Sequence, residues 1–306
     1  MMKATVFAPG SIGNCGPGFD VLGLAVEAVG DRVSVELTDG DPRIDAVTGR
    51  DAELVPLDPH RNAAWLAATA WLRAHGDRRN AVVSIDKGLP VAGGLGGSAA
   101  SSVGGAFAAA LAMGIENPDP LAVVASALEG EVAVAGRHLD NIAPCVLGGL
   151  ALVLSLRPAN VIKLSVAAGW QLALVTPDVR VETKAARELL PATSGRALWV
   201  QQMANTAAVV HAFAAGDAAL LRLAFDDLYA EPRRAPLIPR FPEAKRAAID
   251  AGALGCTISG SGPTLAAICE TEEIARRAGD AMQAAFGEIA STAIVSAIAR
   301  QGVRRV

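Results

Sequence analysis

Apolar and polar residues alternate along several short segments of the chain, and this two-residue period predicts β-strands. The alternation is clearest in RVSVEL (32–37), where every second side chain is polar. Strands are also predicted at KATVFA (3–8), AVVSID (81–86), GLALVLSL (149–156) and LALVT (172–176), and later at CTISG, TLAAIC and one final strand. The strand at 3–8 is expected to end at Pro9-Gly10, because this dipeptide favours a turn.

Other segments place apolar residues three and four positions apart, which predicts helices. Asn62–His75 has this spacing, and Val103–Ile115 is a continuous apolar run of helical character. Pro118–Gly136 is expected to form another long helix, since proline is favoured near helix starts. Further helices are predicted at 182–190, 196–215, 217–228 and 271–286.

Strands and helices in this mixed order, without regular βαβ alternation, indicate an α+β fold built in two layers. A turn is predicted at residues 157–160, and we place a domain boundary there. The expected domains are an N-terminal one over residues 1–157 and a C-terminal one over 158–306. A chain of 306 residues is long enough for two domains with a sizeable core.

Composition and charge narrow the possible partners. Hydrophobic residues make up 52% of the chain and charged residues 19%, which is typical of a globular protein. The formal net charge is −4 and the basic residues are scattered, so a nucleic-acid partner is not expected. The four cysteines lie far apart and form no CxxC pair, which suits reduced thiols in the cytoplasm.

One uncharged stretch, Gly88–Ile115, has the length of a membrane span. Its first half is rich in glycine, serine and proline, however, and only its second half has helical character. The N-terminal residues MMKATVFAPG contain no apolar signal core. We therefore expect a cytoplasmic protein with no membrane partner.

A glycine-rich segment, PVAGGLGGSAASS (90–102), leads into the apolar helical run. The first amides of a helix lack intrahelical partners, the helix dipole is positive at this end, and glycine lets an oxyanion approach closely. A triphosphate would therefore fit at residues 93–98, with the Ser98 hydroxyl available to a phosphate or to Mg²⁺. The segment matches neither the Walker A loop nor the Rossmann fingerprint. Tight Gly/Ala helix packing is the alternative interpretation, because Gly104 and Gly105 follow.

Two more glycine clusters lie near the chain ends. GCTISGSGPTLAAIC (255–269) places Gly260-Ser261-Gly262 between two predicted strands, either as a tight turn or as backbone amides that cover a ligand. APGSIGNCGPGFDVLGLA (8–25) places Asn14 and Asp20 in a turn-rich segment. Turns often use these residue types for local hydrogen bonds, so each residue taken alone is more simply structural.

The three glycine segments, in this order, resemble those of the GHMP kinases. PVAGGLGGSAAS resembles the ATP loop of that family, usually P-x-x-x-G-L-G-S-S-A, except that Gly97 stands in place of the first serine. The early cluster resembles the N-x-G-P-G-F-D-x-L-G pattern of the homoserine kinase branch. Further segments are similar to that branch over nearly the whole chain, namely RHLDNIAPCVLGG (137–149), ETKAARELLP (182–191) and EPRRAPLIPRF (231–241).

This resemblance implies a two-domain GHMP kinase fold, with an α+β N-terminal domain that carries the ATP loop and a ferredoxin-like C-terminal domain. It implies direct phosphoryl transfer from ATP to the side-chain hydroxyl of L-homoserine, with Mg²⁺ as cofactor, in threonine biosynthesis. Homodimers are common in this branch. The alternatives are a GHMP kinase for another small alcohol such as mevalonate, and a catalytically silent nucleotide-binding relative.

The resemblance also implies roles for single residues at the amino-acid site. Arg187 and Arg234 would clamp the substrate carboxylate, with Arg233 as the alternative to Arg234. Asn14 and Asp20 would hold the amine. The other residues implied at the substrate and the reacting hydroxyl are His138, Asp140, Asn141 and Gly260. Asp140 is either a general base or a positioning group, since phosphoryl transfer asks little of a base.

Further residues are implied for ATP and the metal. Those expected to bind ATP are Asn62, Pro90, Gly93, Gly94, Leu95, Gly96, Gly97, Ser98 and Ala99. Asn62 would contact the adenine, and a helix N-cap is the alternative interpretation. Mg²⁺ would take Ser98 and Glu131, with Glu129 as the alternative. Two residues apart on a helix, the two glutamates point in different directions, so only one can face the metal.

Overall fold

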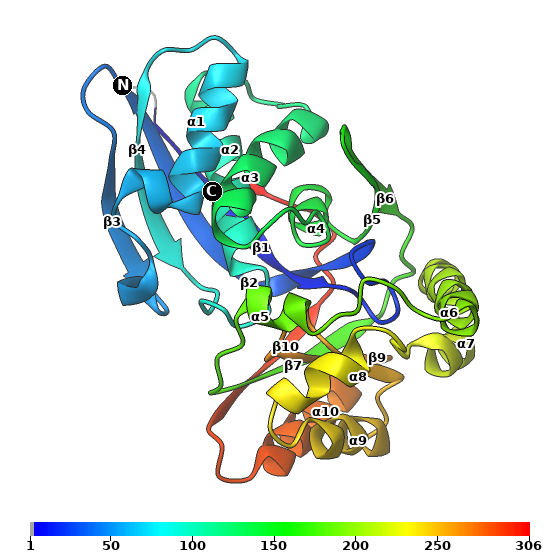
Figure 1. Cartoon of the computed structure of the whole chain (residues 1–306). Coiled ribbons are helices and arrows are strands. Elements are labelled where there is room, and N and C mark those ends of the chain that lie inside the picture. Colours follow the sequence, from blue (N-terminus) through cyan, green and yellow to red (C-terminus); the bar gives the residue numbers. More distant parts are fainter. Residues whose placement is uncertain (1–2) are drawn as a thin grey trace.

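The computed structural model describes residues 3–306, whose strands form two sheets (Figure 1). The first is a seven-stranded sheet in the order β11-β1-β2-β4-β3, with β5 paired to β2 and β6 paired to β5. Its strands are β1 (Lys3–Gly13), β2 (Leu22–Thr38), β3 (Arg43–Gly49), β4 (Asn80–Lys87), β5 (Leu150–Leu156), β6 (Ala159–Leu164) and β11 (Arg304–Arg305).

The predicted end of the first strand at Pro9-Gly10 is wrong. β1 continues to Gly13 and stays paired with β2, and the register shifts between Pro9 and Gly10. A bulge of this kind accommodates a proline, which has no N–H to donate to the ladder. The strand therefore ends directly before Asn14.

Helices α1 (Ala63–Ala74) and α2 (Gly97–Ala112) pack on one face of this sheet, and α3 (Pro120–Val134) packs on both of them. The short α4 (Ile142–Leu147) follows (Figure 1). Between β3 and α1 lie two short 3₁₀ segments, Ala52–Leu54 and Pro59–Arg61. The helix predicted at 62–75 is confirmed, while the apolar run 103–115 belongs to a helix that begins earlier, at the glycine-rich segment.

Helix α2 is the central helix of this layer and packs closely against its neighbours. A Cβ on Gly104 would lie 2.5 Å from Val33 Cγ2, and one on Gly105 would lie 2.0 Å from the carbonyl oxygen of Ala64. The tight-packing interpretation therefore holds for the body of the helix. Its burial also accounts for the uncharged stretch, and within residues 3–306 none of the helices is both long enough and apolar enough to cross a membrane.

The second sheet has four strands in the order β10-β7-β9-β8, and each pair of neighbours is antiparallel. These strands are β7 (Gln171–Pro177), β8 (Gly255–Ile258), β9 (Leu265–Cys269) and β10 (Ser291–Ala297). The helices around it are α5 (Thr183–Glu188), α6 (Arg196–Ala215), α7 (Ala218–Ala224), α8 (Glu231–Arg234), the short 3₁₀ segment Ala235–Leu237, α9 (Phe241–Asp250) and α10 (Glu272–Phe286). Helices lie between β7 and β8 and between β9 and β10, which is the ferredoxin-like βαββαβ arrangement. The predicted α+β fold is confirmed.

The second sheet is buried on both faces, and one face joins the core of the first sheet. Side chains alternate along a strand, so Leu172 and Leu174 of β7 belong to the apolar core that the first sheet and Phe213 of α6 share. Ala173 and Val175 face the other way, into a second core with α9 and α10. The continuous first core ties the two sheets together at the junction where the site lies.

The expected domain division at residues 157–158 falls between β5 and β6, which pair with each other. The N-terminal sheet therefore extends to Leu164. The chain end also returns to this sheet, where β11 pairs Arg305 with Val6 of β1. Figure 1 shows this last segment, in red, running back from the C-terminal part into the N-terminal part.

We predict that Gly105→Ala lowers the free energy of unfolding by about 1–3 kcal/mol, because its methyl group would meet the rigid backbone of α1. Urea unfolding measures this. Gly279→Ala, inside α10, is the matched control, since a Cβ there would make only an ordinary contact of 3.8 Å with Ala293 Cβ; it should not lower the free energy of unfolding, because alanine is the better helix former. Equal unfolding midpoints for the two variants would contradict the close approach of α1 and α2.

Candidate active site

The glycine-rich segment forms an open loop at the N-terminus of α2. Gly94 and Gly96 have φ of +82° and +67°, in the left-handed region that favours glycine. The first intrahelical hydrogen bond runs from Ala100 N to Gly96 O, so the amides of residues 97–99 have no intrahelical acceptor. Gly94 and residues 96–98 are half-buried, which leaves their backbone accessible. The loop can therefore present amides to an anion.

The remaining predicted loop residues are buried and form its base, namely Pro90, Gly93, Leu95 and Ala99. Leu95 accepts a hydrogen bond on its carbonyl from Ser11 N at 3.1 Å, which ties the loop to β1. A Cβ on Gly97 would lie 3.0 Å from the carbonyl oxygen of Pro90. The glycine at this position therefore relieves crowding inside the loop.

The turn between β8 and β9 (residues 259–264) holds this loop from the C-terminal side. The hydroxyl of Ser259 donates to Gly94 O at 2.5 Å, and the hydroxyl of Thr264 donates to Gly93 O. A Cβ on Gly94 would lie 2.7 Å from Ser259 O, so glycine is required where the two backbones meet. Neither hydroxyl residue was predicted from the sequence, because their role depends on contacts between distant segments.

The amides of Gly260 and Gly262 are already paired. Gly260 N donates to Gly13 O at 2.9 Å, and Gly262 N donates to Ser259 O at 2.9 Å. These bonds fit the tight-turn interpretation for both glycines, and the hypothesis that amides of this turn cover a ligand stays a prediction. Gly260 contributes through its carbonyl, which accepts from Asn14 Nδ2 at 2.9 Å and from Arg234 Nη1 at 2.8 Å. It joins the two predicted halves of the amino-acid site.

Asn14 and Asp20 delimit a tight loop between β1 and β2. Both have positive φ, 56° and 58°, values that asparagine and aspartate tolerate better than other non-glycine residues. Asn14 Oδ1 accepts from Asp20 N at 2.8 Å, which closes the loop. The structural role suggested by residue type is therefore present, and it orients the Asp20 carboxylate toward the junction.

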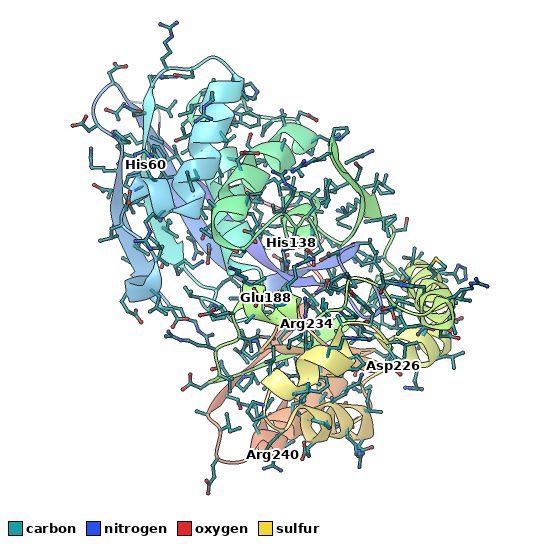
Figure 2. The ribbon with its side chains drawn as sticks, viewed as in Figure 1. His60, His138, Glu188, Asp226, Arg234 and Arg240 are labelled. Atoms are coloured by element: carbon teal, nitrogen blue, oxygen red, sulfur yellow. The ribbon has the colours of Figure 1, made fainter. Side chains whose placement is uncertain are left out.

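Asp20 forms the centre of a charged cluster. Arg187 Nη2 donates to both of its carboxylate oxygens, at 2.8 and 2.7 Å, and to His138 Nδ1 at 2.8 Å. His138 Nδ1 must then be the acceptor, so the imidazole is neutral with its proton on Nε2. Burial and the Arg187 charge both lower the pKa of His138, which agrees with this tautomer. Figure 2 shows His138 near the middle of the molecule, where the two parts meet.

Arg234 lies on the other side of the cluster and is only 4% exposed. Its guanidinium carbon lies 5.4 Å from the centroid of the Phe19 ring, and that of Arg187 lies 5.6 Å from the same centroid. Burial lowers the pKa of Arg234, an effect that the nearby Asp20 charge opposes. Arg233 points elsewhere, over the Tyr229 ring at 5.3 Å. Of the two candidate arginines, Arg234 is the one in the cluster.

Asp140 and Asn141 lie between this cluster and the glycine-rich loop. Asp140 Oδ2 accepts from Asn14 N at 3.0 Å, and Asn141 Oδ1 accepts from Ser11 Oγ at 2.9 Å. A Cβ on Gly96 would lie 3.0 Å from Asn141 Oδ1, so Asn141 touches the loop. Burial and the charge of Asp20 raise the pKa of Asp140 to about 7. The carboxyl can therefore exchange a proton near neutral pH.

Glu131 faces the loop from α3. Its Oε1 accepts from Ser98 Oγ at 3.0 Å, whereas Glu129 is exposed. Burial raises the pKa of Glu131 to about 7, and its Oε2 is buried without a hydrogen-bond partner. A hydroxyl and a carboxylate with one free oxygen are ligands that Mg²⁺ accepts. Ser98 and Glu131 thus fit a magnesium ion at the edge of the loop.

A buried ion pair contacts the glycine-rich loop at the start of α2. It was not predicted from the sequence. Lys87 Nζ pairs with Asp31, and donates to Gly97 O at 3.2 Å and to Ser101 Oγ at 3.1 Å. Asp31 also accepts from the amides of Gly88 and Leu89, both at 3.2 Å. The register of β2 and β4, which pairs Arg32 with Asp86, brings the adjacent residues Asp31 and Lys87 together. Only a prediction of this register could have found the ion pair from the sequence.

Asn62 has a structural role. It is the N-cap of α1, and its Oδ1 accepts from the amides of Ala64 at 3.1 Å and Trp65 at 3.3 Å. Its Nδ2 donates to Pro56 O at 2.9 Å, and the residue is 1% exposed. Oδ1 already accepts two hydrogen bonds and the side chain is almost fully buried, so it offers little surface for an adenine contact. The N-cap interpretation is the one that the geometry supports.

Comparison with known families places this geometry in context. Residues 62–149 match the family model described as "GHMP kinases N terminal domain", and residues 209–288 match "GHMP kinases C terminal". The curated homoserine kinase of Xanthomonas campestris pv. campestris is 40% identical over 292 residues, which cover 94% of this chain and 89% of the relative.

Solved structures agree. The crystal structure of homoserine kinase from Cytophaga hutchinsonii has a TM-score of 0.94 and 37% identity, and the match covers 100% of this chain and 98% of that one. The L. major mevalonate kinase structure, in complex with R-mevalonate, has a TM-score of 0.73 at 15% identity, with 95% of each chain covered. That second likeness concerns the fold alone.

We predict that Glu131→Gln stabilises the metal-free protein at pH 8 and not at pH 5. The folded protein retains a proton that the unfolded chain releases above pH 4.5, so wild-type stability falls as the pH rises from there to about 7. Glutamine removes this cost. Melting temperatures at the two pH values, without metal, measure the effect.

The exposed Glu129→Gln variant is the matched control and should melt like the wild type at both pH values. MgADP should raise the melting temperature of the wild type more than that of Glu131→Gln, because binding to the folded state stabilises it. A Glu131→Gln variant that is less stable than the wild type at pH 8 would contradict the unpaired burial of this carboxylate.

Proposed function

This chain belongs to the GHMP kinase family, and we propose that it transfers the γ-phosphoryl group of ATP to the side-chain hydroxyl of L-homoserine. The product is O-phospho-L-homoserine, an intermediate of threonine biosynthesis. One observation carries the proposal beyond the similarity to homoserine kinases: the β8–β9 turn binds both Arg234, in the cluster of opposite charges with Asp20 and Arg187, and the glycine-rich loop at the start of α2.

The charged cluster suits a zwitterion. The substrate carboxylate would bind Arg187 and Arg234, and its amine would bind Asp20 and Asn14. In the free protein Asp20 and Arg187 satisfy each other. A zwitterion inserted between them would give each side chain a new partner of opposite charge. The side chains of Arg187 and Asp20 are 41% and 36% exposed, so their pair can open at little cost to admit the substrate. An alcohol without an amine, such as mevalonate, would offer Asp20 no cation.

The loop suits the nucleotide. The free amides of residues 97–99 and the helix dipole favour the phosphates of ATP. Ser98 and Glu131 would hold Mg²⁺, which neutralises charge on the phosphates when bound. The raised pKa of Glu131 supports this assignment, because a buried carboxyl that lacks a cation holds its proton and a cation releases it.

The reacting hydroxyl would lie beside Asp140 and Asn141, between the two halves of the site. Because the transition state of phosphoryl transfer is loose, positioning and charge stabilisation supply most of the rate. Within this proposal Asp140 accepts the hydroxyl proton, and its pKa of about 7 suits that task. His138 acts by accepting from Arg187 and so fixes the guanidinium. The four buried, free cysteines suit a reducing cytoplasm.

The direct test is ADP release by the purified protein with MgATP and a panel of L-homoserine, D-homoserine, L-serine and R-mevalonate. We expect turnover selective for L-homoserine, with the phosphorylated product identified by ³¹P NMR. Turnover with mevalonate alone would overturn the substrate assignment and keep the kinase. Nucleotide binding without turnover of any alcohol would favour a catalytically silent relative.

We predict that Arg187→Met raises the KM for L-homoserine by about 10- to 100-fold, because a charge-assisted hydrogen bond contributes roughly 1.5–3 kcal/mol. The KM for ATP should change little, since the hydrogen bonds of Arg187 go to Asp20 and His138 and not to the loop. Initial rates with each substrate varied in turn measure both constants. Arg233→Met is the control, and an equal rise in both variants would contradict the assigned clamp.

A further inference from the structure

We propose that Gln202 and Asp227 are positioning residues that hold the carboxylate side and the amine side of the amino-acid site in register. Neither residue belongs to the charged cluster itself. Gln202 lies on α6 and is 3% exposed, and Asp227 lies between α7 and α8 and is 6% exposed. The inference rests on the proposed function, because the register matters only if both ends of one substrate are bound.

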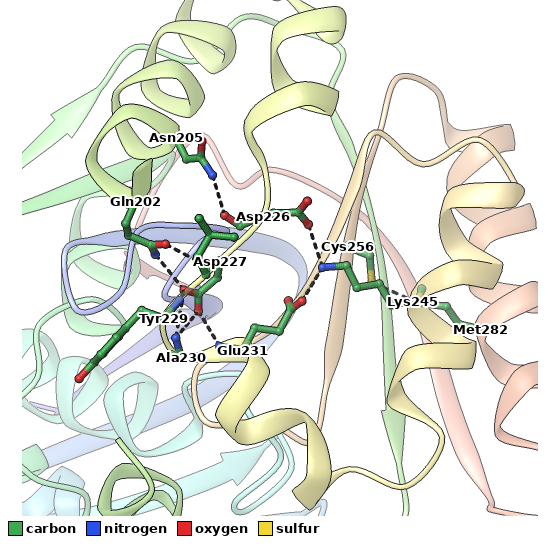
Figure 3. A network of polar contacts seen from close by, with 11 residues as sticks. Gln202, Asn205, Asp226, Asp227, Tyr229, Ala230, Glu231, Lys245, Cys256 and Met282 are labelled. Atoms are coloured by element: carbon green, nitrogen blue, oxygen red, sulfur yellow. Dashed lines mark hydrogen bonds and ion pairs between the residues drawn. The ribbon is translucent and has the colours of Figure 1, made fainter. Parts of the chain in front are cut away.

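Asp227 fixes the segment that carries Arg234. Its carboxylate accepts hydrogen bonds from the amides of Tyr229 at 2.8 Å, Ala230 at 3.1 Å and Glu231 at 2.9 Å. It thereby gathers the amides at the start of α8, the single-turn helix that ends at Arg234. Figure 3 shows these bonds converging on one carboxylate. The direction in which Arg234 leaves the backbone therefore depends on Asp227.

Gln202 joins this segment to the loop between β1 and β2. Its Nε2 donates to Asp227 Oδ1 at 2.8 Å and to Pro17 O at 2.7 Å. Its Oε1 accepts from Leu228 N at 2.9 Å. Pro17 lies within the tight loop that Asn14 and Asp20 close. The buried side-chain amide of Gln202 thus links the segment that orients Arg234 to the loop that orients Asp20.

Aromatic contacts join the same two segments, the loop between β1 and β2 and the segment before α8. Phe19, next to Asp20, meets the Tyr229 ring edge-on with 5.1 Å between the centroids. Both arginines of the cluster lie over Phe19. A shift of the α8 segment relative to the Pro17 loop would therefore move Arg234 and Phe19 together. Because a misplacement of about 1 Å can cost about 10²-fold in rate, a network one layer behind the substrate can control recognition.

The neighbouring Asp226 has a different environment, which provides a matched control. Its side chain is 68% exposed and pairs with Lys245 Nζ at 3.0 Å. That lysine also binds Glu231. In Figure 3 the Asp226 carboxylate points toward Lys245 and away from Gln202. Asp226 and Asp227 thus offer adjacent carboxylates of which only one faces the network.

The experiment compares Asp227→Asn, Gln202→Met and Asp226→Asn in the full-length protein with L-homoserine and with 3-amino-1-propanol, which lacks the carboxylate. For Asp227→Asn and Gln202→Met we expect the KM for L-homoserine to rise about tenfold, since a positioning residue acts through the contacts it aligns. The preference for L-homoserine over 3-amino-1-propanol in kcat/KM should fall by a similar factor. The dissociation constant for MgADP should stay unchanged.

Asp226→Asn should keep the wild-type values throughout. Circular dichroism and the melting temperature establish that each variant is folded. If Asp227→Asn fails to fold, Gln202→Met still tests the inference, because it leaves the amide bonds of Asp227 intact. Folded variants with wild-type KM and wild-type preference would overturn the positioning role. A wild type that does not phosphorylate L-homoserine would instead contradict the proposed function.

Discussion

The turn between β8 and β9 is the constraint on which the rest of the site depends. Its residues 259–264 bind the glycine-rich loop through two side-chain hydroxyls, and its Gly260 binds Gly13, Asn14 and Arg234 through backbone atoms. The glycine-rich loop and the charged cluster are therefore held relative to each other by contacts with the same turn.

Buried charge is the second theme of the structure. The site holds Glu131 and Asp140 at positions where burial raises their pKa values to about 7, so near neutral pH each carboxyl costs stability that a neutral side chain would not. Asp31 and Lys87 are also buried, but they neutralise each other. Glu131 and Asp140 have no such partner, and they are the carboxyls proposed to face the metal and the substrate hydroxyl. Stability is thus lowered where a bound ligand can restore it.

Much of the fold followed from periodicity, because the helix at residues 62–75 and the strand at 81–86 bury one face each and so repeat with the period of their element. Elements that tertiary contacts decide were missed, such as β6 and the single turn of α8. The amino-acid site was found only through family resemblance, since Asp20 and Arg187 are 167 positions apart and no local pattern joins them. Asn62 shows the limit of that approach, because motif position alone could not tell a helix cap from a ligand contact.

The central claim is that a site already filled by opposite charges selects a zwitterion. The most direct measurement is calorimetric titration of the wild-type protein with L-homoserine, with 3-amino-1-propanol and with 4-hydroxybutanoate, which lack the carboxylate and the amine respectively. We expect L-homoserine to bind at least about tenfold more tightly than either truncated compound, because each of those loses the charge-assisted contacts of one end of the site, either to Asp20 or to Arg187. Comparable affinity for L-homoserine and for either truncated compound would contradict it.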